Sequence, residues 1–548
     1  MNIKKFKFNH EVISIIRKES FGTNWPVVYI INDDSQYYIG ETTHVHTRVA
    51  QHLKNPDKNK LKIFRVINDD DFNKSATLDI ESSLIKFFSA EGISLQNGNG
   101  GLSEHNYFDK EKYQVMFENI WEELKKLGIV KKDLIQLKNT DLFKYSPYKA
   151  LTSDQFDVAD DILKDIRSQF TGAIKVSGSP GTGKSILAVY LIKYLKDSVD
   201  FKHLNIALVV PMTSFRNTLK KVFRNVKNLS SSMVIGPNDV VKKEYDLLFV
   251  DEAHRLKQRK NLTNYGSFDS VNRQLGLVNG SQLDWIKNSS KQQILFYDAH
   301  QSIHPSDADF SDFSFVKEYA LNSQVRVRGG DKYINFIEHF LGEVPVLPDF
   351  ENYDFKLFDS LNELVLAIRS KESGVDGNFK GLSRLLAGYA WEWISKKDPT
   401  KFDIVVGDVK LKWNSVASDW ANSSNAFAEV GCIHTIQGYD LNYAGVIIGP
   451  ELSYDFEKNE LVVFKNKYKD KKGKAAINTV EQLKRYILNI YRVLLTRGVY
   501  GTYIYICDDD LRTYFKNSLK TENLIEYGLI HDQSLAVAEK KIDYGSDK

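Results

Sequence analysis

Cysteine is almost absent from this chain: its 548 residues include only Cys432 and Cys507. Two thiols are too few for a disulfide framework or a zinc cluster, and they fit a reducing cytoplasm. Long apolar runs are also missing, since none reaches the roughly 20 residues that a membrane-spanning helix needs. The apolar group at residues 12–16 is short and is cut off by Arg17 and Lys18, unlike an export signal. The sequence therefore predicts a soluble, cytoplasmic protein without a membrane partner.

A strong imbalance of charge is lacking as well. There are 74 basic and 71 acidic residues, so the formal net charge is only +3. No global positive field indicates a nucleic-acid partner, and any such contact must come from local patches. Hydrophobic residues make up 42% and charged residues 26%, a balance typical of globular domains with ample cores. The length predicts about three or four domains.

The most informative stretch is GSPGTGKS, which begins at Gly178 and ends at Ser185. A short apolar strand pattern precedes it at 172–177, and an apolar helix pattern follows at 186–195. Glycines let backbone N–H groups converge on phosphate oxygens, and the helix N-terminus adds a favourable dipole. Lys184 would reach the outer phosphates, and the Ser185 hydroxyl would ligate Mg²⁺. The stretch predicts that a nucleotide, ATP or GTP, is bound by Gly178, Pro180, Gly181, Thr182, Gly183, Lys184 and Ser185.

The tetrapeptide DEAH supplies a second nucleotide motif. Asp251 follows the apolar run LLFV directly, which places it at the end of a buried strand. There it could hold Mg²⁺ through water, and Glu252 could polarise the attacking water. The motif predicts hydrolysis of the bound nucleotide.

Near-continuous apolar runs indicate strands that are buried on both faces of parallel sheets. The first set lies at 206–211, 247–253 and 294–299, and the second at 403–408, 444–451 and 502–508. Residues 257–291 and 454–484 are polar and are interpreted as insertions. The second insertion carries KNKYKDKKGK, which could contact phosphates but is more typical of a solvated loop. The expected divisions are 1–102, 103–150 (a helical connector), 151–345, 346–530 and a tail at 531–548.

Further motifs accompany these two. Gln155 precedes a helix pattern, Asp298 and Gln301 lie in FYDAHQSI, and Arg326 ends QVR. Gln437 and Gly438 lie in HTIQGYD with Asp440, and Arg497 lies in YRVLLTRG. Together with the phosphate loop and DEAH, they resemble superfamily 1 helicases over residues 151–511. The resemblance is strongest to the bacterial helicase-like domain related to the Schlafen group.

This resemblance implies two RecA-like parallel-sheet domains and a role for each motif. Gln155 would read adenine, which favours ATP over GTP, while Asp298 and Gln301 would sense the γ-phosphate. Arg326 would reach towards the phosphates, and Arg497 would act as an arginine finger. The pair Gln437 and Gly438 would join the second sheet to ATP and to the nucleic-acid strand. ATP would then hold the two sheets together until hydrolysis releases them.

The first hundred residues show a different pattern. Strand patterns at 27–32, 37–42 and 62–68 alternate with helix patterns at 44–53 and 77–89, which predicts a small α+β domain. Arg48 and His52 are four residues apart and so share one helical face. Glu81 shares a face with apolar neighbours, which is costly unless the carboxylate is paired or bound to a metal.

The series Tyr29, Tyr38-Ile39-Gly40, Arg48, His52, Glu81 and Asn97 resembles the GIY-YIG nuclease family. The family's first glycine is lost, since the motif here is Val27-Val28-Tyr29. The resemblance implies that Glu81 binds Mg²⁺ or Mn²⁺, that Arg48 holds the phosphate and that Asn97 supports the site. Tyr29, with Tyr38 or His52, would activate water. Taken singly, the tyrosines could only pack, Arg48 could be a surface charge, and Glu81 could pair with Arg48 or Lys86.

These resemblances imply an ATP-driven nucleic-acid motor coupled to a metal-dependent endonuclease. They imply DNA rather than RNA as the expected partner and a role in bacterial defence against phage, with a partner protein or homo-oligomer left open. The alternatives are an ATPase switch whose N-terminal domain only binds nucleic acid, and a DNA-repair nuclease-helicase.

Overall fold

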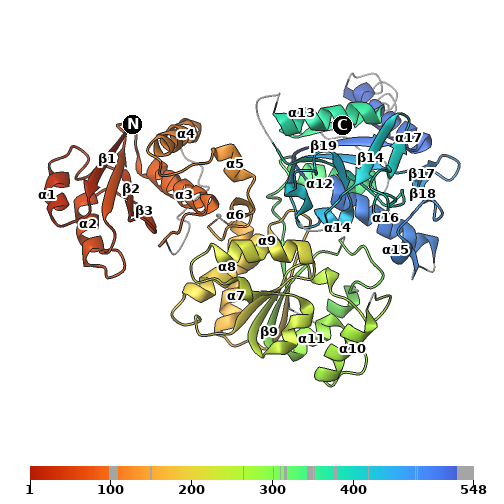
Figure 1. Ribbon diagram of the computed structural model, residues 1–548, viewed down its shortest axis with the longest axis horizontal. Helices are drawn as coiled ribbons and strands as arrows, with labels where there is room; N and C mark the ends of the chain where they lie inside the picture. The colour runs from red at the N-terminus through yellow and green to blue at the C-terminus, as the bar shows by residue number, and fades with distance from the viewer. Residues whose placement is uncertain are drawn as a thin grey trace, which may run out of the picture. The chain divides into compact units, whose positions relative to one another are not determined.

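The computed structural model divides the chain into two compact units (Figure 1). The first comprises Met1–Ala299 and Ser306–Ser323, and the second comprises His300–Pro305 and Gln324–Lys548. The residues described are 1–97, 109–148, 151–262, 264–299, 301–308, 310–313, 317–341, 350, 352–374, 381–416, 419–475, 477 and 479–526. The expected tail at 531–548 therefore lies outside the described residues.

An antiparallel sheet begins the first unit, in the order β1-β4-β2-β3. Its residues alternate between two faces: Val28 and Ile30 pack with helix α3, whereas Val27 and Ile31 pack with α1 and α2. The elements are β1 (Asn2–Lys7), α1 (Glu11–Arg17), β2 (Val27–Asn32), β3 (Tyr37–Thr42), α2 (Val45–Lys54), β4 (Ile63–Asn68) and α3 (Lys74–Glu91). The predicted order from β2 to α3 is present, and the sequence patterns missed β1 and α1.

The edge strand β3 is covered by the residues that follow α3. Tyr37 N–H donates to the Ser94 carbonyl at 2.9 Å, and Gln96 N–H donates to the Tyr37 carbonyl at 2.8 Å. The Asn97 amide then donates to the Ile39 carbonyl at 2.8 Å and accepts from the Ile39 N–H at 3.1 Å. Residues 94–97 thus pair with β3 like a short added strand, and the Asn97 side chain continues this pairing.

The helical connector packs on α3. Trp121 is fully buried and contacts the rings of Phe87 and Phe88. The connector helices are α4 (Lys110–Lys126), α5 (Leu134–Lys138) and α6 (Asp141–Lys144). This segment therefore extends the core of the first unit.

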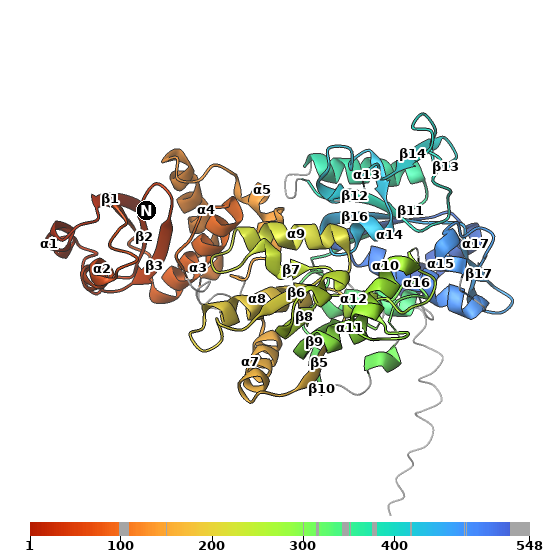
Figure 2. The same ribbon diagram turned by 60° about the horizontal axis from the view of Figure 1, so that its bottom comes forward.

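A six-stranded, fully parallel sheet follows, in the order β10-β5-β9-β8-β6-β7 (Figure 2). The strands are β5 (Gly172–Gly178), β6 (Ile206–Val209), β7 (Val234–Ile235), β8 (Tyr245–Val250), β9 (Ser290–Tyr297) and β10 (Lys317–Leu321). The helices are α7 (Ser153–Arg167), α8 (Lys184–Asp197), α9 (Thr213–Arg224), α10 (Tyr265–Gln274) and α11 (Gln282–Asn288), with 3₁₀ helices η1 (Ser231–Met233), η2 (Pro237–Lys242), η3 (Ala253–Arg255) and η4 (Phe310–Phe313).

The polar stretch at 257–291 is more than an insertion. It carries α10 and α11, whose Phe268 and Trp285 join a core with Val209, Leu248 and Val250 of the sheet. Helices α8 and α9 pack on the opposite face. Both faces of the first parallel sheet are thus covered, as its apolar strands require.

A seven-stranded sheet forms the second unit, in the order β11-β19-β16-β12-β15-β14-β13. Its strands are β11 (Asp354–Phe358), β12 (Ser383–Ala387), β13 (Ile404–Val406), β14 (Val409–Trp413), β15 (Glu429–Gly431), β16 (Leu441–Ile448) and β19 (Gly498–Ile506). The helices are α12 (Gly330–Phe340), α13 (Leu361–Ser373), η5 (Trp420–Asn422), α14 (Ile433–Ile436), α16 (Val480–Leu495) and α17 (Asp509–Glu526). The insertion at 454–484 overlaps the hairpin β17 (Leu452–Asp455) and β18 (Glu460–Val463) and contains α15 (Lys471–Ala475).

Two expectations for this region need correction. The run at 403–408 is not a buried parallel strand, because β13 pairs antiparallel with β14 at the sheet edge and Gly407 turns the chain at φ +55°. The second unit begins at Gln324, ahead of the expected boundary at 345, since α12 packs into the core of the second sheet. The Tyr333 hydroxyl fixes this helix by donating to the Leu495 carbonyl at 2.8 Å.

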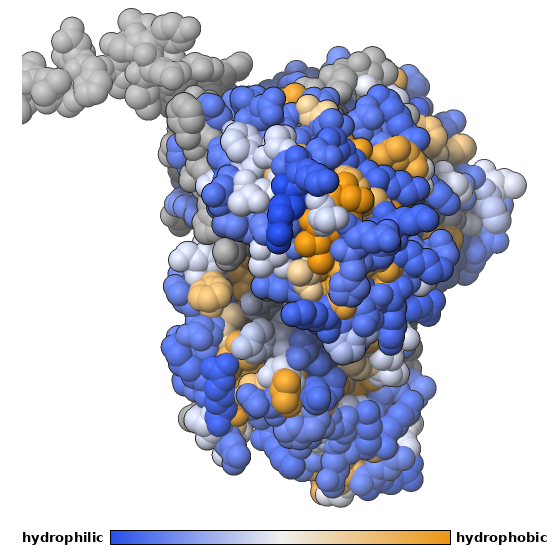
Figure 3. Space-filling model, turned by 90° about the vertical axis from the view of Figure 1, so that its left-hand side faces the viewer, coloured by the Kyte–Doolittle hydropathy of each residue, from blue (hydrophilic) through white to orange (hydrophobic). Residues whose placement is uncertain are grey.

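The predicted mixed α/β class is confirmed, with one fully parallel sheet and a second sheet that is parallel except for its edge strand β13. No helix in the described part of the chain is both long and apolar enough to cross a membrane. The face drawn in Figure 3 is mostly hydrophilic, with small hydrophobic groups scattered among charged and polar residues.

Candidate active sites

The phosphate loop lies between β5 and α8. Gly181 and Gly183 have φ angles of +90° and +80°, a backbone region that favours glycine. A Cβ atom at Gly178 would lie 2.5 Å from the Thr182 hydroxyl. Lys184 Nζ donates to the carbonyls of Gly178 at 2.6 Å and Ser179 at 3.0 Å. The lysine is thus folded over the loop where phosphates would be held.

Acidic side chains converge on the same loop. Asp251 follows β8, is 1% exposed and lies beside the Ser185 hydroxyl. Its Oδ2 atom is buried without a hydrogen-bond partner among the described residues. Burial and the neighbouring Glu252 hold the pKa of Asp251 well above its usual range. A buried carboxylate oxygen beside a serine hydroxyl fits the oxygen ligands that Mg²⁺ prefers, so Ser185 and Asp251 could hold this ion.

Two further contacts complete this corner of the first unit. Lys184 Nζ lies 3.3 Å from the Asp298 carboxylate, which is nearly fully buried. Glu252 has φ +54°, and its Oε2 lies 2.9 Å from Nε2 of the fully buried His254. A positive φ on a glutamate is uncommon and costs strain, which is typical of functional sites. His254 is therefore placed to orient Glu252.

Gln155 ties helix α7 to the phosphate loop. Its amide donates to the Thr182 carbonyl at 2.8 Å, while its Oε1 accepts from the Thr152 N–H at 3.1 Å. The side chain is 2% exposed. Adenine recognition by Gln155 stays a prediction.

The N-terminal domain brings three predicted residues together around the buried Tyr29. The Tyr29 hydroxyl lies 2.8 Å from His52 Nε2 and accepts from Arg48 Nε at 3.3 Å. The Tyr38 ring meets the His52 ring edge-on at 4.9 Å. A Cβ atom at Gly40, the cross-strand partner of Tyr29, would lie 2.3 Å from the Tyr29 hydroxyl. Glycine is therefore required at position 40 to admit the tyrosine ring.

The protonation states around Tyr29 follow from its burial. Burial raises the pKa of Tyr29 well above its usual value. Burial and the cations Lys58 and Arg48 lower the pKa of His52 to about 3. His52 is thus neutral at physiological pH, and since Arg48 donates to Tyr29, the tyrosine proton points towards His52.

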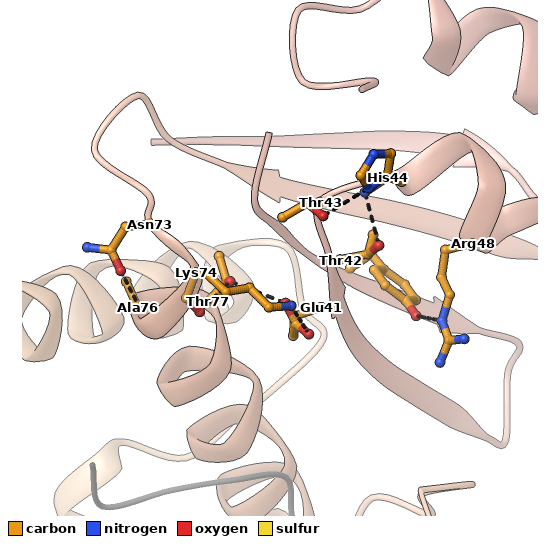
Figure 4. Close-up of polar contacts among 10 residues, drawn as sticks. Glu41, Thr42, Thr43, His44, Arg48, Asn73, Lys74, Ala76 and Thr77 are labelled. Carbon is orange, nitrogen blue, oxygen red and sulfur yellow. Dashed lines mark hydrogen bonds and ion pairs between the residues drawn. The ribbon is translucent and has the colours of Figure 1, made fainter. Parts of the chain in front are cut away.

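Glu81 on α3 lies beside a second carboxylate that the sequence patterns did not single out. Its carboxylate lies beside the Glu41 backbone N–H, and burial together with the Glu41 carboxylate raises the pKa of Glu81 to about 7. The Glu41 carboxylate pairs with Lys74 and accepts from the Thr77 hydroxyl at 3.4 Å (Figure 4). Lys86 instead lies over the Phe143 ring at 5.1 Å. The neighbouring carboxylates of Glu81 and Glu41 could together hold a divalent cation.

The raised pKa of Glu81 predicts a pH-dependent cost in stability. The folded state binds this proton more tightly than the unfolded chain, so stability is lost as pH rises from about 4.5 to about 7. In metal-free buffer, Glu81→Gln should therefore raise the free energy of unfolding at pH 8 by roughly 2 kcal/mol, and by much less at pH 5.

Urea unfolding followed by circular dichroism measures this difference. The matched control is Asp79→Asn on the same helix, two positions away and so on a different face. Equal gains at pH 5 and pH 8 would contradict the assigned shift.

The second unit contains the remaining predicted residues. Gln437 is 3% exposed, and neither amide atom has a hydrogen-bond partner among the described residues. Gly438 has φ +84°, and Arg326 Nε lies 2.5 Å from the Asp440 carboxylate. Gln301 also belongs to this unit and is 4% exposed, whereas Asp298 belongs to the first.

Arg497 is 1% exposed. It donates to the carbonyls of Val493 at 3.0 Å and Tyr439 at 3.4 Å. The guanidinium thus joins the end of α16 to the turn before β16. Its action as an arginine finger stays a prediction.

Similar proteins include an uncharacterized protein of Saccharomyces cerevisiae, YPL245W, which is 27% identical over 390 residues, covering 62% of this chain and 82% of the yeast protein. Among solved structures, the helicase of PRRSV is 12% identical with a TM-score of 0.29, covering 64% of this chain and 54% of the viral chain. The Pif1 helicase of Candida albicans is 12% identical with a TM-score of 0.28, covering 69% of this chain and 100% of the Candida chain. A Bacteroides Pif1 helicase in complex with ADP-AlF3 and ssDNA is 12% identical with a TM-score of 0.29, covering 68% of this chain and 98% of the Bacteroides chain.

A family model described as Schlafen group 3, DNA/RNA helicase domain, matches residues 172–508. This span includes the phosphate loop, Asp251 and the strands of both parallel sheets from β5 to β19. The match extends over more than half of the sequence, and the chain therefore belongs to the Schlafen group 3 DNA/RNA helicase domain family.

Proposed function

We propose that this chain is an ATP-driven nucleic-acid motor joined to a metal-dependent endonuclease. Membership of a helicase-domain family supports the motor. The observation that carries the ATPase is the convergence of Lys184, Ser185, Asp251 and Asp298 at the phosphate loop.

Each residue of this corner has a distinct task in hydrolysis. Lys184, now bound to loop carbonyls, would exchange them for phosphate oxygens when a nucleotide enters. Ser185 and Asp251 would hold Mg²⁺, which neutralises charge on the phosphates. Glu252, oriented by His254, would direct a water molecule at the γ-phosphate. Gln301, Arg326, Gln437, Gly438 and Arg497 are proposed as the residues through which the second unit responds to ATP.

The nuclease proposal rests on the hydrogen-bonded set Tyr29, His52 and Arg48. A neutral His52 can take the Tyr29 proton when the tyrosine accepts one from water, while Arg48 leaves guanidinium donors for a phosphate. Glu81, with Glu41 beside it, would hold Mg²⁺ or Mn²⁺, which stabilises charge on the phosphodiester. We propose DNA as the substrate and phage defence as the setting, with DNA repair as the alternative.

Strand displacement tests the motor directly. We expect single-stranded DNA to stimulate ATP hydrolysis and a tailed DNA duplex to separate only when ATP can be hydrolysed. RNA strands of the same sequence, assayed in parallel, test the preference for DNA. Hydrolysis without strand separation would instead favour a nucleotide-controlled switch.

A further inference from the structure

Two histidines and an aspartate that serve neither proposed site come together within the second unit. His304 follows β9, His434 lies on the short helix α14, and Asp470 immediately precedes α15. One ligand atom from each residue lies within 4.8 Å of the other two. The three positions are far apart in the sequence, so the fold alone brings them together.

The spacing of the two imidazoles matches a shared metal ion better than a direct hydrogen bond. Their Nε2 atoms are 3.4 Å apart, and the ring centroids are 5.0 Å apart. Hydrogen bonds with an N–H donor are usually about 2.9–3.0 Å long, so a direct bond here would be stretched. A tetrahedral ion with Zn–N bonds of about 2.0–2.1 Å holds two nitrogen ligands about 3.3 Å apart.

The residues around the three side chains orient Asp470 and leave the group open to an ion from solvent. Asp470 Oδ1 accepts from the Gly473 N–H at 2.9 Å, a contact that fixes the carboxylate as outer-shell partners do in metal sites. The preceding residue, Lys469, donates its N–H to the Tyr389 carbonyl at 2.7 Å. The Tyr389 ring lies 5.6 Å from the His434 ring. His304 and Asp470 are half-buried and His434 is exposed, so an ion can reach the ligands from solvent.

We propose that His304, His434 and Asp470 bind a divalent transition metal ion, with zinc as the best match. The two imidazoles are borderline ligands, which suit zinc better than Mg²⁺ or Ca²⁺, and zinc also accepts a carboxylate oxygen as a third ligand. Three protein ligands leave a fourth tetrahedral position for solvent.

The ion would act as a cross-link between segments of the second unit. His304 lies three positions after Gln301, and His434 lies three positions before Gln437. Asp470 lies within the lysine-rich run at 465–474. Bound zinc would therefore anchor this basic insertion to the segments that carry two predicted motor residues.

Metal analysis of the full chain tests the site. After removal of metal with a chelator, the protein is titrated with Zn²⁺ in excess Mg²⁺, which occupies the sites made of oxygen ligands. We expect one tightly bound Zn²⁺ per chain in the wild type, and binding at least about 100-fold weaker in His434→Ala and in Asp470→Ala. Co²⁺ in place of Zn²⁺ should give the visible absorption of a tetrahedral site in the wild type and not in these two variants.

The matched control is His339→Ala, which removes an exposed histidine on α12 of the same unit. It should bind Zn²⁺ as the wild type does. Circular dichroism confirms that each variant is folded, and the exposed position of His434 makes that variant the decisive one. Zn²⁺ binding that is equal in the wild type and His434→Ala would overturn the proposal, as would the absence of tight Zn²⁺ binding by the wild type.

Discussion

Lys184→Ala is expected to lower ATP hydrolysis by on the order of 10²- to 10³-fold, because it removes a preorganised cation from the phosphates in the transition state. The side chain is 8% exposed and reaches the Gly178 and Ser179 carbonyls, so it already occupies the phosphate-facing side of the loop. Phosphate release under saturating ATP measures the loss.

Lys193→Ala is the matched control. Lys193 lies on the same helix, is 4% exposed and pairs with Asp197 four positions later. Its loss removes a similarly buried lysine without touching the loop, and hydrolysis should stay within a few-fold of wild type. Equal losses in both variants would show a general effect on α8 and would contradict the assigned role of Lys184.

Lys184→Ala also tests whether the motor supplies DNA to the nuclease. If it does, Lys184→Ala should lose most cleavage of long DNA while short substrates are still cut. Full cleavage of long substrates by Lys184→Ala would show two independent activities.

Glu81→Ala is expected to abolish metal-dependent cleavage, with a loss on the order of 10³-fold, because it removes the carboxylate proposed to hold the cation. Cleavage of plasmid and single-stranded substrates with Mg²⁺ or Mn²⁺ measures the effect. In the wild type, cleavage should rise with pH through about 7, since a protonated Glu81 cannot ligate a cation.

Asp79→Ala serves as the control for an acidic residue of the same helix, and it should cleave as the wild type does. Tyr29→Phe provides a second test of the nuclease proposal, because it removes the hydroxyl between Arg48 and His52 and keeps the buried ring. Equal cleavage by wild type and Glu81→Ala would end the nuclease proposal and favour a domain that only binds nucleic acid.

Much of the fold could be predicted where an element has a strong apolar pattern of its own. Strands β2 and β16 are buried along their whole length, and the sequence shows both as apolar runs. Strand β1 is different, since its lysines leave it partly exposed at the sheet edge and its pattern is weak. Helices α10 and α11 look polar because only a few side chains, such as Phe268 and Trp285, reach the core.

The functional sites, too, could be predicted only where a local sequence pattern marks them. Lys184 and Ser185 could be found because a phosphate loop is a local motif with fixed spacing. Glu41 and His304 could not, because their partners Glu81 and His434 are brought near by tertiary packing. The assignment of α12 to the second unit likewise depends on the buried contact of Tyr333 with Leu495.

The pairing of residues 94–97 with β3 has a consequence for any shortened form of the N-terminal domain. Strand β3 ends its sheet, and an uncovered edge strand offers N–H and C=O groups as a template for pairing between molecules. A chain that stopped before Ser94 would keep Tyr29, Arg48 and Glu81 but bare this edge. Its first failure would then be self-association in solution, and a loss of activity on that account would say nothing about the chemistry.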